Sequence, residues 1–210
     1  MSLTRDDVVR AAVALLDDVG LEGLTLRRLA ADLGVSAPTL YWHVRHKREL
    51  LDLMAEAIIV EAGGRSGAPA PGQPWWEWLA EQGRLQWRAL VTHRDAALVV
   101  AGNRPTDSSL PFVEETIHSL VTAGFAPGDA LENLFAVGHY VIGCALEYQA
   151  ESARQQQGVA DVAPPGRLSG WPYLAAAFNQ RGGTDPAASF NHGLQLLIDG
   201  MRTRLADPLG

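Results

Sequence analysis

The chain contains little cysteine and no long apolar run, and each absence excludes a class of protein. Its 210 residues include one cysteine, Cys144, so neither an internal disulfide nor a cysteine-rich zinc site can form. The longest apolar stretch, residues 135–146, is interrupted by His139 and is too short to span a bilayer. The first residues lack the basic and then apolar pattern of a secretion signal. We therefore expect a cytoplasmic protein with no membrane contact.

The groupings that carry enzyme catalysis are also missing. The sequence contains no Ser-His-Asp or Cys-His pattern, no glycine-rich phosphate loop and no dense set of metal ligands. His139 and Glu147 lie two turns apart on one expected helix and could form an acid–base pair. A buried histidine and a paired carboxylate explain them more simply. The sequence predicts neither an enzyme nor a bound cofactor or metal.

Positive charge is concentrated in one short segment. The chain carries a formal net charge of −7, yet residues 25–48 hold five basic side chains against one acidic side chain, a local balance of +4. The rest of the chain therefore carries −11, and Lys47 is the only lysine. Such asymmetry is typical of a protein that contacts nucleic-acid phosphates with one small face. A solvated helix face is the alternative for the charge run taken alone.

The same segment has the pattern of a helix-turn-helix. Thr25 and Ser36 are each placed to cap a helix, because each precedes a run with apolar periodicity. Gly34 tolerates the left-handed backbone of the turn, and Ala30 is small enough for the second helix to cross close over it. The side chains expected to be buried are Leu26, Leu29, Ala30, Leu33, Leu40 and Val44. Together with the local charge, this pattern predicts DNA binding.

Apolar periodicity predicts helices for most of the remaining chain and no strand. Thr4 and Asp7 form a capping box before an apolar helix that Gly20 should close. We expect the later helices at residues 47–62, 75–90, 95–101, 108–123, 127–152, 171–179 and 186–205. The predicted fold class is all-α, with a three-helix head (1–46) that contains the helix-turn-helix, a connecting helix (47–62) and a larger helical body (63–210).

Longer stretches of the chain resemble one family of regulators. The recognition and connecting helices of the tetracycline repressor family are similar to the run Pro38-Thr39-Leu40-Tyr41-Trp42-His43-Val44, followed by Lys47-Arg48 and Leu50-Leu51-Asp52. The likeness continues through residues 93–95, 102–106, 136–139 and 143–147. The chain thus resembles this family, the TetR family, over nearly its whole length, in the body as well as in the head.

The resemblance implies a symmetric homodimer that binds a palindromic double-stranded DNA operator. The two heads would lie in successive major grooves, about 34–36 Å apart, and a small-molecule inducer in each body would change that spacing. By resemblance, the dimer contact is a four-helix bundle formed by helix 129–152 and the last helix of each subunit. Four apolar residues fit this contact but could equally face the core of their own subunit: Leu194, Leu197, Ile198 and Met201.

The resemblance also implies which residues contact DNA. The positions that match the family's operator contacts are Thr25, Arg27, Pro38, Thr39, Tyr41, Trp42, His43 and Lys47. Hydroxyl, imidazole and basic side chains can bind phosphate oxygens or base edges. Core packing is the alternative for Tyr41 and Trp42. Ala37 stands where the tetracycline repressors use a glutamine to recognise a base, so we expect this DNA-binding position to favour a different operator sequence.

A ligand pocket is implied in the body, with altered chemistry. The tetracycline repressors bind a magnesium-chelated drug through a histidine, whereas Val100 at that position cannot coordinate a metal. Glu147 alone remains as a metal-side acid. The expected ligand-binding residues are Gln82, Gln86, Val100, Asn103, Arg104, Pro105, Val113, Thr116, Leu131, Leu134, His139, Glu147, Trp171 and Leu174. This mostly apolar set predicts a hydrophobic or polycyclic inducer other than magnesium-tetracycline, although surface or structural hydrogen bonds are the alternative for Gln82 and Gln86.

These observations predict a ligand-responsive, DNA-binding transcription regulator that acts as a repressor until its inducer binds. A different class of protein remains as an alternative, one that binds or converts a small molecule without controlling an operator. Product formation, or tight ligand binding with no operator response, would identify that class. An activator is a further alternative, because the sequence does not separate it from a repressor.

Overall fold

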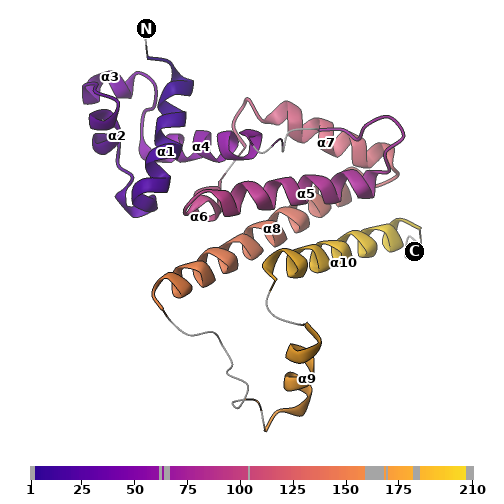
Figure 1. Cartoon of the computed structure of the whole chain (residues 1–210). Helices are drawn as coiled ribbons and strands as arrows, with labels where there is room; N and C mark the ends of the chain where they lie inside the picture. Colours follow the sequence, from indigo (N-terminus) through magenta and orange to yellow (C-terminus); the bar gives the residue numbers. More distant parts are fainter. Residues whose placement is uncertain are drawn as a thin grey trace.

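The molecule is built from helices throughout its described length. The computed structural model describes residues 3–61, 63, 67–103, 105–158, 168, 170–181 and 185–206. These residues form no strand, which confirms the all-α prediction. The helices are α1 (Arg5–Gly23), α2 (Leu26–Asp32), α3 (Ala37–Tyr41), α4 (Lys47–Glu61), α5 (Trp75–Thr92), α6 (Ala96–Val100), α7 (Leu110–Thr122), α8 (Pro127–Gln156), α9 (Pro172–Arg181) and α10 (Pro186–Ala206). Figure 1 shows α1–α3 as a head at one end, joined by α4 to a body of α5–α10.

Helix α1 begins as the sequence predicts and ends slightly later. Thr4 Oγ1 accepts a hydrogen bond from Asp7 N, and the Asp7 carboxylate accepts from Thr4 N, so the capping box is confirmed. The hydrogen bonds that the Asp7 carboxylate accepts, from the Thr4 hydroxyl and then from Thr4 N, lower the pKa of Asp7. Gly20 breaks the helix with φ of 71°, but one more turn continues to Gly23. The reason lies in the body, because Leu21 N donates to Asp95 Oδ2 at 2.8 Å instead of within α1.

The helix-turn-helix forms with the expected caps and core. Thr25 Oγ1 accepts from Arg28 N, and Ser36 Oγ accepts from Thr39 N. Gly34 takes φ of 65°, a left-handed conformation that favours glycine. Most of the side chains expected inside are buried, namely Leu29, Ala30, Leu40 and Val44, while Leu26 and Leu33 are half-buried. The caps and the small turn residue therefore set the angle at which α3 is presented.

Helix α4 joins the head to the body. His46 Nδ1 accepts from Glu49 N at 3.1 Å and satisfies a free amide at the start of the helix. Leu50, Met54 and Ile58 are buried at helical spacing, and α4 packs against α1 on one side and against α5 and α6 on the other. The apolar side chains of α4 pack against both the head and the body. We therefore expect a movement of α4 to move the head relative to the body.

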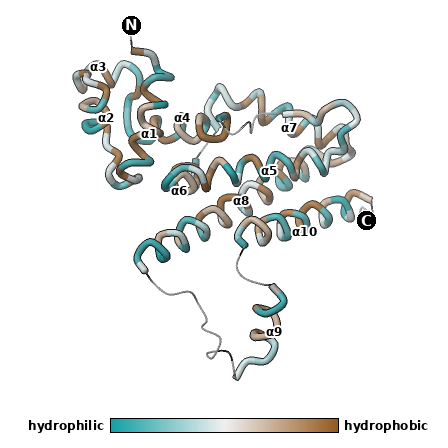
Figure 2. Tube along the Cα trace, in the orientation of Figure 1, coloured by the Kyte–Doolittle hydropathy of each residue, from teal (hydrophilic) through white to brown (hydrophobic). Residues whose placement is uncertain are grey.

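The core of the body forms where α5, α8 and α10 meet. Hydrophobic and hydrophilic residues alternate along α5 in Figure 2, as expected for a helix that buries one face. Helix α8 runs to Gln156, one turn beyond the expected end, and packs against α5, α7 and α10. Leu194, Ile198 and Met201 of α10 are buried within the single subunit and Leu197 is half-buried. None of the described helices is both long and apolar enough to cross a membrane.

Helices α8 and α10 approach closely at one glycine. Tyr140 donates to the Phe190 carbonyl at 3.0 Å and its ring stacks on the Phe190 ring. A Cβ atom on Gly193 would lie 2.1 Å from the Tyr140 hydroxyl oxygen, so only glycine fits here. Burial, together with a hydrogen bond to Cys144, raises the pKa of Tyr140 to about 12. The hydroxyl therefore stays protonated and remains a donor at neutral pH.

Helix α9 forms within two residues of its predicted range but stands apart from the other body helices (Figure 1). Its apolar side chains are exposed, Tyr173 to 92% and Leu174 to 47%, and so is Trp171 just before it, to 65%. An apolar surface of this kind is unusual on an isolated subunit. The described part of the chain therefore leaves the apolar side chains of α9 uncovered.

Candidate functional site

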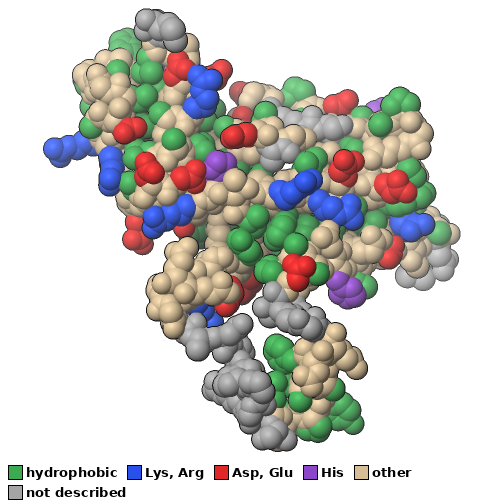
Figure 3. Space-filling view, viewed as in Figure 1, with side chains coloured by type: hydrophobic (Ala, Val, Ile, Leu, Met, Phe, Trp, Pro, Cys, Tyr) green, Lys and Arg blue, Asp and Glu red, His purple; other side chains and the backbone are tan. Residues whose placement is uncertain are grey.

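Two aromatic side chains project from the recognition helix into solvent. Tyr41 is 52% exposed and Trp42 is 89% exposed, whereas Leu40 and Val44 are buried beneath them. The core-packing alternative therefore fails for both aromatic residues. Figure 3 shows basic side chains at the outer edge of the head, near α2. The head thus presents exposed aromatic groups at the end of α3, whose other face is anchored, and exposed basic groups near α2.

The other predicted DNA contacts are mostly accessible too. Arg27, Ala37, Pro38, Thr25 and Thr39 are exposed, and His43 is half-buried. The hydroxyls of the two threonines also bind locally, Thr25 at its helix cap and Thr39 to Ser36 Oγ at 2.8 Å. Lys47 differs from the rest, because its Nζ donates to the Leu21 carbonyl at 3.1 Å. In this conformation the lysine ammonium is bound to the head's own backbone.

A short segment between α5 and α6 fastens the head to the body. Asp17 of α1 accepts from Arg94 N at 2.9 Å, and one of its oxygens lies 2.8 Å from His93 Nδ1. Gln149 of α8 donates to the carbonyls of Leu90 and His93, both at 2.9 Å. Resemblance alone singled out His93 in the sequence. The interaction with Asp17, more than 70 residues away in the chain, could not be read from any local pattern.

The body contains a mostly apolar cavity of about 390 Å³ that is partly open to solvent. Helices α4, α5, α7 and α8 and the segment after α6 form its walls. Nine of the predicted ligand-binding residues line it: Gln82, Gln86, Val100, Asn103, Pro105, Val113, Thr116, Leu134 and His139. The size and the lining are typical of a site for a small organic molecule.

Some predicted pocket residues do not line this cavity. Leu131 is half-buried on α8, and Glu147 on the same helix is exposed. Trp171 and Leu174 lie at the start of α9, which stands clear of the body (Figure 1). Arg104 lies outside the described residues. The structure of one subunit therefore gathers the predicted positions of α5, α7 and the α6 region and two of those on α8, but not Leu131, Glu147 or the two positions near α9.

Three aromatic residues in the cavity wall were not predicted from the sequence. Trp78, Phe112 and Phe135 line the cavity, each one helical turn before a predicted pocket residue. Trp78 precedes Gln82 by four positions, and the other two precede Thr116 and His139 by the same interval. Residues four apart share a helix face. Extending each predicted position by one turn would have found all three.

The polar atoms in the cavity differ in how they are satisfied. The Thr116 hydroxyl donates to the Phe112 carbonyl and the Ser109 hydroxyl to the Thr106 carbonyl, both at 2.9 Å. In contrast, Gln82 Oε1 is inaccessible to solvent and has no hydrogen-bond partner among the described residues. A buried acceptor without a donor costs about 1–3 kcal/mol. Gln82 lines the cavity, so a rotation of its side chain would bring this acceptor to a ligand that carries a donor.

The residues in the wall do not fit a divalent cation. Val100 presents an aliphatic side chain at the position of the family's metal ligand, and Glu147 lies outside the lining. Glu56 does line the cavity, but its carboxylate accepts hydrogen bonds from the Thr106 and Ser108 hydroxyls. Within the described part of the chain, no three His, Cys, Asp or Glu side chains are grouped as a metal site requires.

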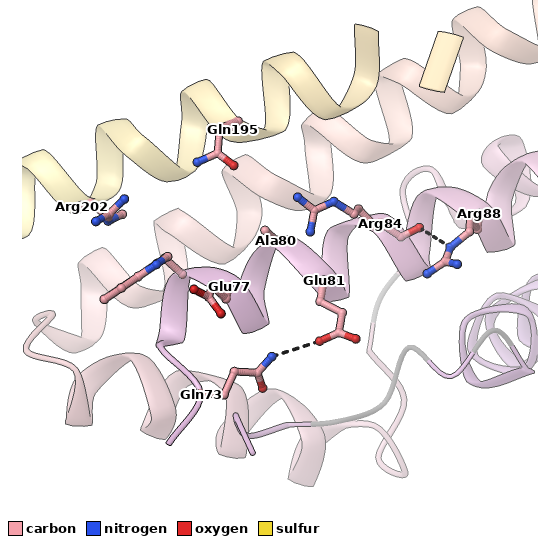
Figure 4. A pocket seen from close by; sticks show the side chains of 9 residues that line it. Gln73, Glu77, Ala80, Glu81, Arg84, Arg88, Gln195 and Arg202 are labelled. Atoms are coloured by element: carbon pink, nitrogen blue, oxygen red, sulfur yellow. Dashed lines mark hydrogen bonds between the residues drawn. The ribbon is translucent and has the colours of Figure 1, made fainter. Parts of the chain in front are cut away.

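A second hollow, of about 590 Å³, lies between α5 and α10. Figure 4 shows its charged side chains, with Gln73 bound to Glu81 and Arg88 bound to the Arg84 carbonyl. The lining residues are Gln73, Trp76, Glu77, Ala80, Glu81, Arg84, Arg88, Gln195 and Arg202. Three arginines and two glutamates nearly cancel in charge, and the groove is polar. The groove therefore favours neither a charged ligand nor an apolar one. The 390 Å³ cavity is the better candidate for a ligand site.

Known proteins share both parts of this architecture. Residues 8–54 match the bacterial regulatory proteins of the tetR family, and residues 68–205 match the tetracyclin repressor-like C-terminal domain. The class E tetracycline repressor protein of Escherichia coli is 39% identical over 203 residues, which cover 97% of this chain and 92% of the repressor. The crystal structure of a TetR variant from Acinetobacter baumannii AYE in complex with minocycline superposes with a TM-score of 0.82 at 35% identity, covering 99% of this chain and 97% of that one.

The likeness extends to regulators outside the tetracycline repressors. Apo ActR from Streptomyces coelicolor superposes with a TM-score of 0.80 at 28% identity, and the match covers 100% of both chains. Head, connecting helix and body are therefore shared over at least 92% of the length of each of these relatives. The chain belongs to the TetR family of bacterial regulatory proteins, which are ligand-responsive, DNA-binding transcriptional repressors and not enzymes.

Proposed function

We propose that this chain is a repressor that binds a palindromic operator as a homodimer and is released by a small hydrophobic or polycyclic inducer other than magnesium-tetracycline. The observation that carries the inducer's chemistry is the cavity itself. It is mostly apolar, has Val100 where a metal ligand would stand, and holds the unpaired Gln82 Oε1. We propose that the chain consists of a DNA-binding head (1–46), a connecting helix (47–62) and a ligand-binding and dimerisation body (63–210).

The operator contacts follow from the exposed surface of the head. The proposed set is Thr25, Arg27, Ala37, Pro38, Thr39, Tyr41, Trp42, His43 and Lys47. Arg27 and Tyr41 supply donors for phosphate oxygens or base edges, and the methyl of Thr39 can contact a thymine methyl. Ala37 has no hydrogen-bonding side chain, so this position supports only an apolar contact with the DNA base that it faces. To engage phosphate, Lys47 Nζ must leave the Leu21 carbonyl.

The shape and polarity of the cavity support a flat inducer with a hydroxyl or N–H group. Trp78, Phe112 and Phe135 supply aromatic surface for ring contacts. Gln82 Oε1 needs a donor, and Gln86 and Asn103 add amides that can orient the ligand. The similar TetR variant from Acinetobacter baumannii binds minocycline in its crystal structure. In this chain the residues support a neutral ligand held without a metal.

Replacing Gln82 by methionine distinguishes two effects of its unpaired amide oxygen, a loss of stability in the ligand-free protein and a gain in affinity for the inducer. We expect Gln82→Met to stabilise the ligand-free protein by about 1 kcal/mol, because a buried unpaired acceptor is removed at nearly constant volume. The same change should weaken inducer binding about tenfold through loss of one hydrogen bond. Thermal unfolding and isothermal titration measure the two effects. A less stable Gln82→Met protein would show that the amide oxygen is already satisfied.

Two surfaces support the homodimer. Leu196 on α10 is 61% exposed and Phe135 on α8 is 47% exposed, so apolar groups remain uncovered on both helices of the implied bundle. Helix α9, which stands clear of its own cavity, carries exposed Trp171 and Leu174. We place these two residues against the cavity of the second subunit, which accounts for their absence from the lining within one chain. Leu131 and Glu147 on α8 remain proposed pocket residues on the same basis.

A charge on the uncovered α10 face should break the dimer. Leu196→Glu places two glutamates in a two-fold symmetric interface, where each is desolvated without a partner. We expect the dimer to dissociate into folded monomers at micromolar concentration, as measured by light scattering, with far-UV circular dichroism unchanged. Gln195→Glu is the control, because the neighbouring side chain is exposed and already polar. A Leu196→Glu protein that remains dimeric would place the interface elsewhere.

A mobility shift with the DNA upstream of the protein's own gene distinguishes the proposed function from its rival. A repressor should retard one palindromic fragment at physiological salt and leave unrelated fragments free. A protein that binds or converts a small molecule without operator control should retard none of them, even at low salt. The exposed Tyr41 and Trp42 favour the first outcome, because a protein without a DNA partner gains nothing from two solvated aromatic groups on one short helix.

A further inference from the structure

One side chain connects the base of the head with the wall of the ligand cavity. Arg48 lies in the first turn of α4, directly after Lys47. Its Nη2 atom lies 2.8 Å from the Gly102 carbonyl oxygen and 3.3 Å from Asn103 Oδ1. Gly102 and Asn103 both line the cavity. The guanidinium therefore touches, from outside, two residues that a ligand would touch from inside.

The surroundings of Arg48 make this contact specific. Asp52, one turn along α4, forms an ion pair with the same Nη2 atom at 2.9 Å, although its Oδ1 atom accepts no hydrogen bond, and the attraction keeps the guanidinium beside the cavity wall. On the other side, Gly102 takes φ of 70° and Asn103 N donates to the Val100 carbonyl at 3.0 Å, which fixes the turn that presents both acceptors. The Arg48 guanidinium is charged, so its hydrogen bonds to the Gly102 carbonyl and to Asn103 Oδ1 are stronger than bonds between neutral groups.

We propose that Arg48 is a positioning residue that latches the head to the cavity wall through Asn103, and that an inducer which donates a hydrogen bond to Asn103 Oδ1 releases this latch. The inference rests on the proposed function and adds a route from ligand to DNA. With the latch closed, α4 holds each head at a fixed angle. With the latch open, the head gains freedom, and fixing two heads at the spacing of successive major grooves costs more entropy. Operator affinity then falls without loss of any DNA contact.

The test replaces the acceptor, which lies in the body, and measures operator binding by fluorescence anisotropy over a series of salt concentrations. Asn103→Ala should weaken binding about fivefold, because a half-exposed charged contact is lost in each subunit. Its salt dependence should equal that of the wild type, because no phosphate contact is lost. Asn103→Asp is the conservative variant: it keeps an acceptor for Arg48 and should recover most of the affinity that Asn103→Ala loses.

The double variant Arg48→Ala/Asn103→Ala completes the cycle. If the two residues act through one contact, the double variant should bind no more weakly than Arg48→Ala alone. Additive losses would overturn the latch, and so would an Asn103→Ala protein with wild-type affinity. A salt slope that falls by about 0.9 for each head in Arg48→Ala would also overturn it, since that result makes Arg48 a phosphate contact. If the wild type itself binds no fragment, the proposed function falls together with the latch.

Discussion

The double variant Arg27→Ala/Tyr41→Ala should bind the operator about 100-fold more weakly than the wild type. Each substitution removes a donor from the DNA-facing surface, and a homodimer loses every contact twice. Both side chains are exposed, so the fold should be unaffected. The dependence of affinity on salt should also flatten, by about 0.9 in slope for each phosphate contact that is lost. Fluorescence anisotropy with labelled operator DNA measures both quantities.

The chain offers a matched control for this variant. Arg10→Ala/His118→Ala also removes one exposed arginine and one exposed ring, from α1 and α7, outside the proposed DNA surface. Its operator affinity and its salt slope should equal those of the wild type. If the two double variants bind equally well, the α2 and α3 surface is not the operator contact, and the placement of the recognition helix is wrong.

The substitution Gly193→Ala should destabilise the body by about 2–3 kcal/mol, the usual cost of forcing an extra methyl group into a packed contact. The added Cβ would lie 2.1 Å from the Tyr140 hydroxyl oxygen and 2.7 Å from the ring carbon that carries it. The ring has little room to retreat, because its hydroxyl donates to the Phe190 carbonyl. We expect the melting temperature to fall by about 5–10 °C in calorimetry.

A second substitution should reverse part of this loss. In Gly193→Ala/Tyr140→Ala the obstructing ring is gone, so Gly193→Ala should cost much less in that background than in the wild type. Gly128→Ala is the control for a glycine inside a helix, because nothing lies within 4 Å of its added Cβ. It should leave stability unchanged or raise it slightly. A Gly193→Ala protein as stable as Gly128→Ala would show that the α8–α10 contact has room for the added methyl group.

The helix termini were predictable because their determinants are local. The caps at Thr4, Thr25 and Ser36 each join a side chain to a backbone amide three residues ahead, and that distance is visible in the sequence. The extra turn after Gly20 was not predictable. It depends on the bond between Leu21 N and Asp95, 74 residues away, which only the folded chain brings together.

Helical periodicity reveals which residues share a face but not what that face meets. It grouped Leu194, Ile198 and Met201 correctly, yet it could not decide between the subunit core and a dimer contact; all three are buried within one subunit. It likewise predicted α9 as a helix but not that Trp171 and Leu174 would lie away from their own cavity. Resemblance placed most of the cavity positions, and the Arg48 contact with Asn103 required the structure.

We propose that the inducer acts without a metal, and one titration tests this metal independence directly. Labelled operator DNA bound to the protein is titrated with a neutral polycyclic phenol, and in parallel with tetracycline plus magnesium, each with and without a chelator. We expect the phenol to release the DNA equally with and without chelator, and magnesium-tetracycline not to release it. Release by micromolar tetracycline that disappears when magnesium is chelated would contradict the account, because Val100 and the rest of the cavity wall would then support metal-dependent binding after all.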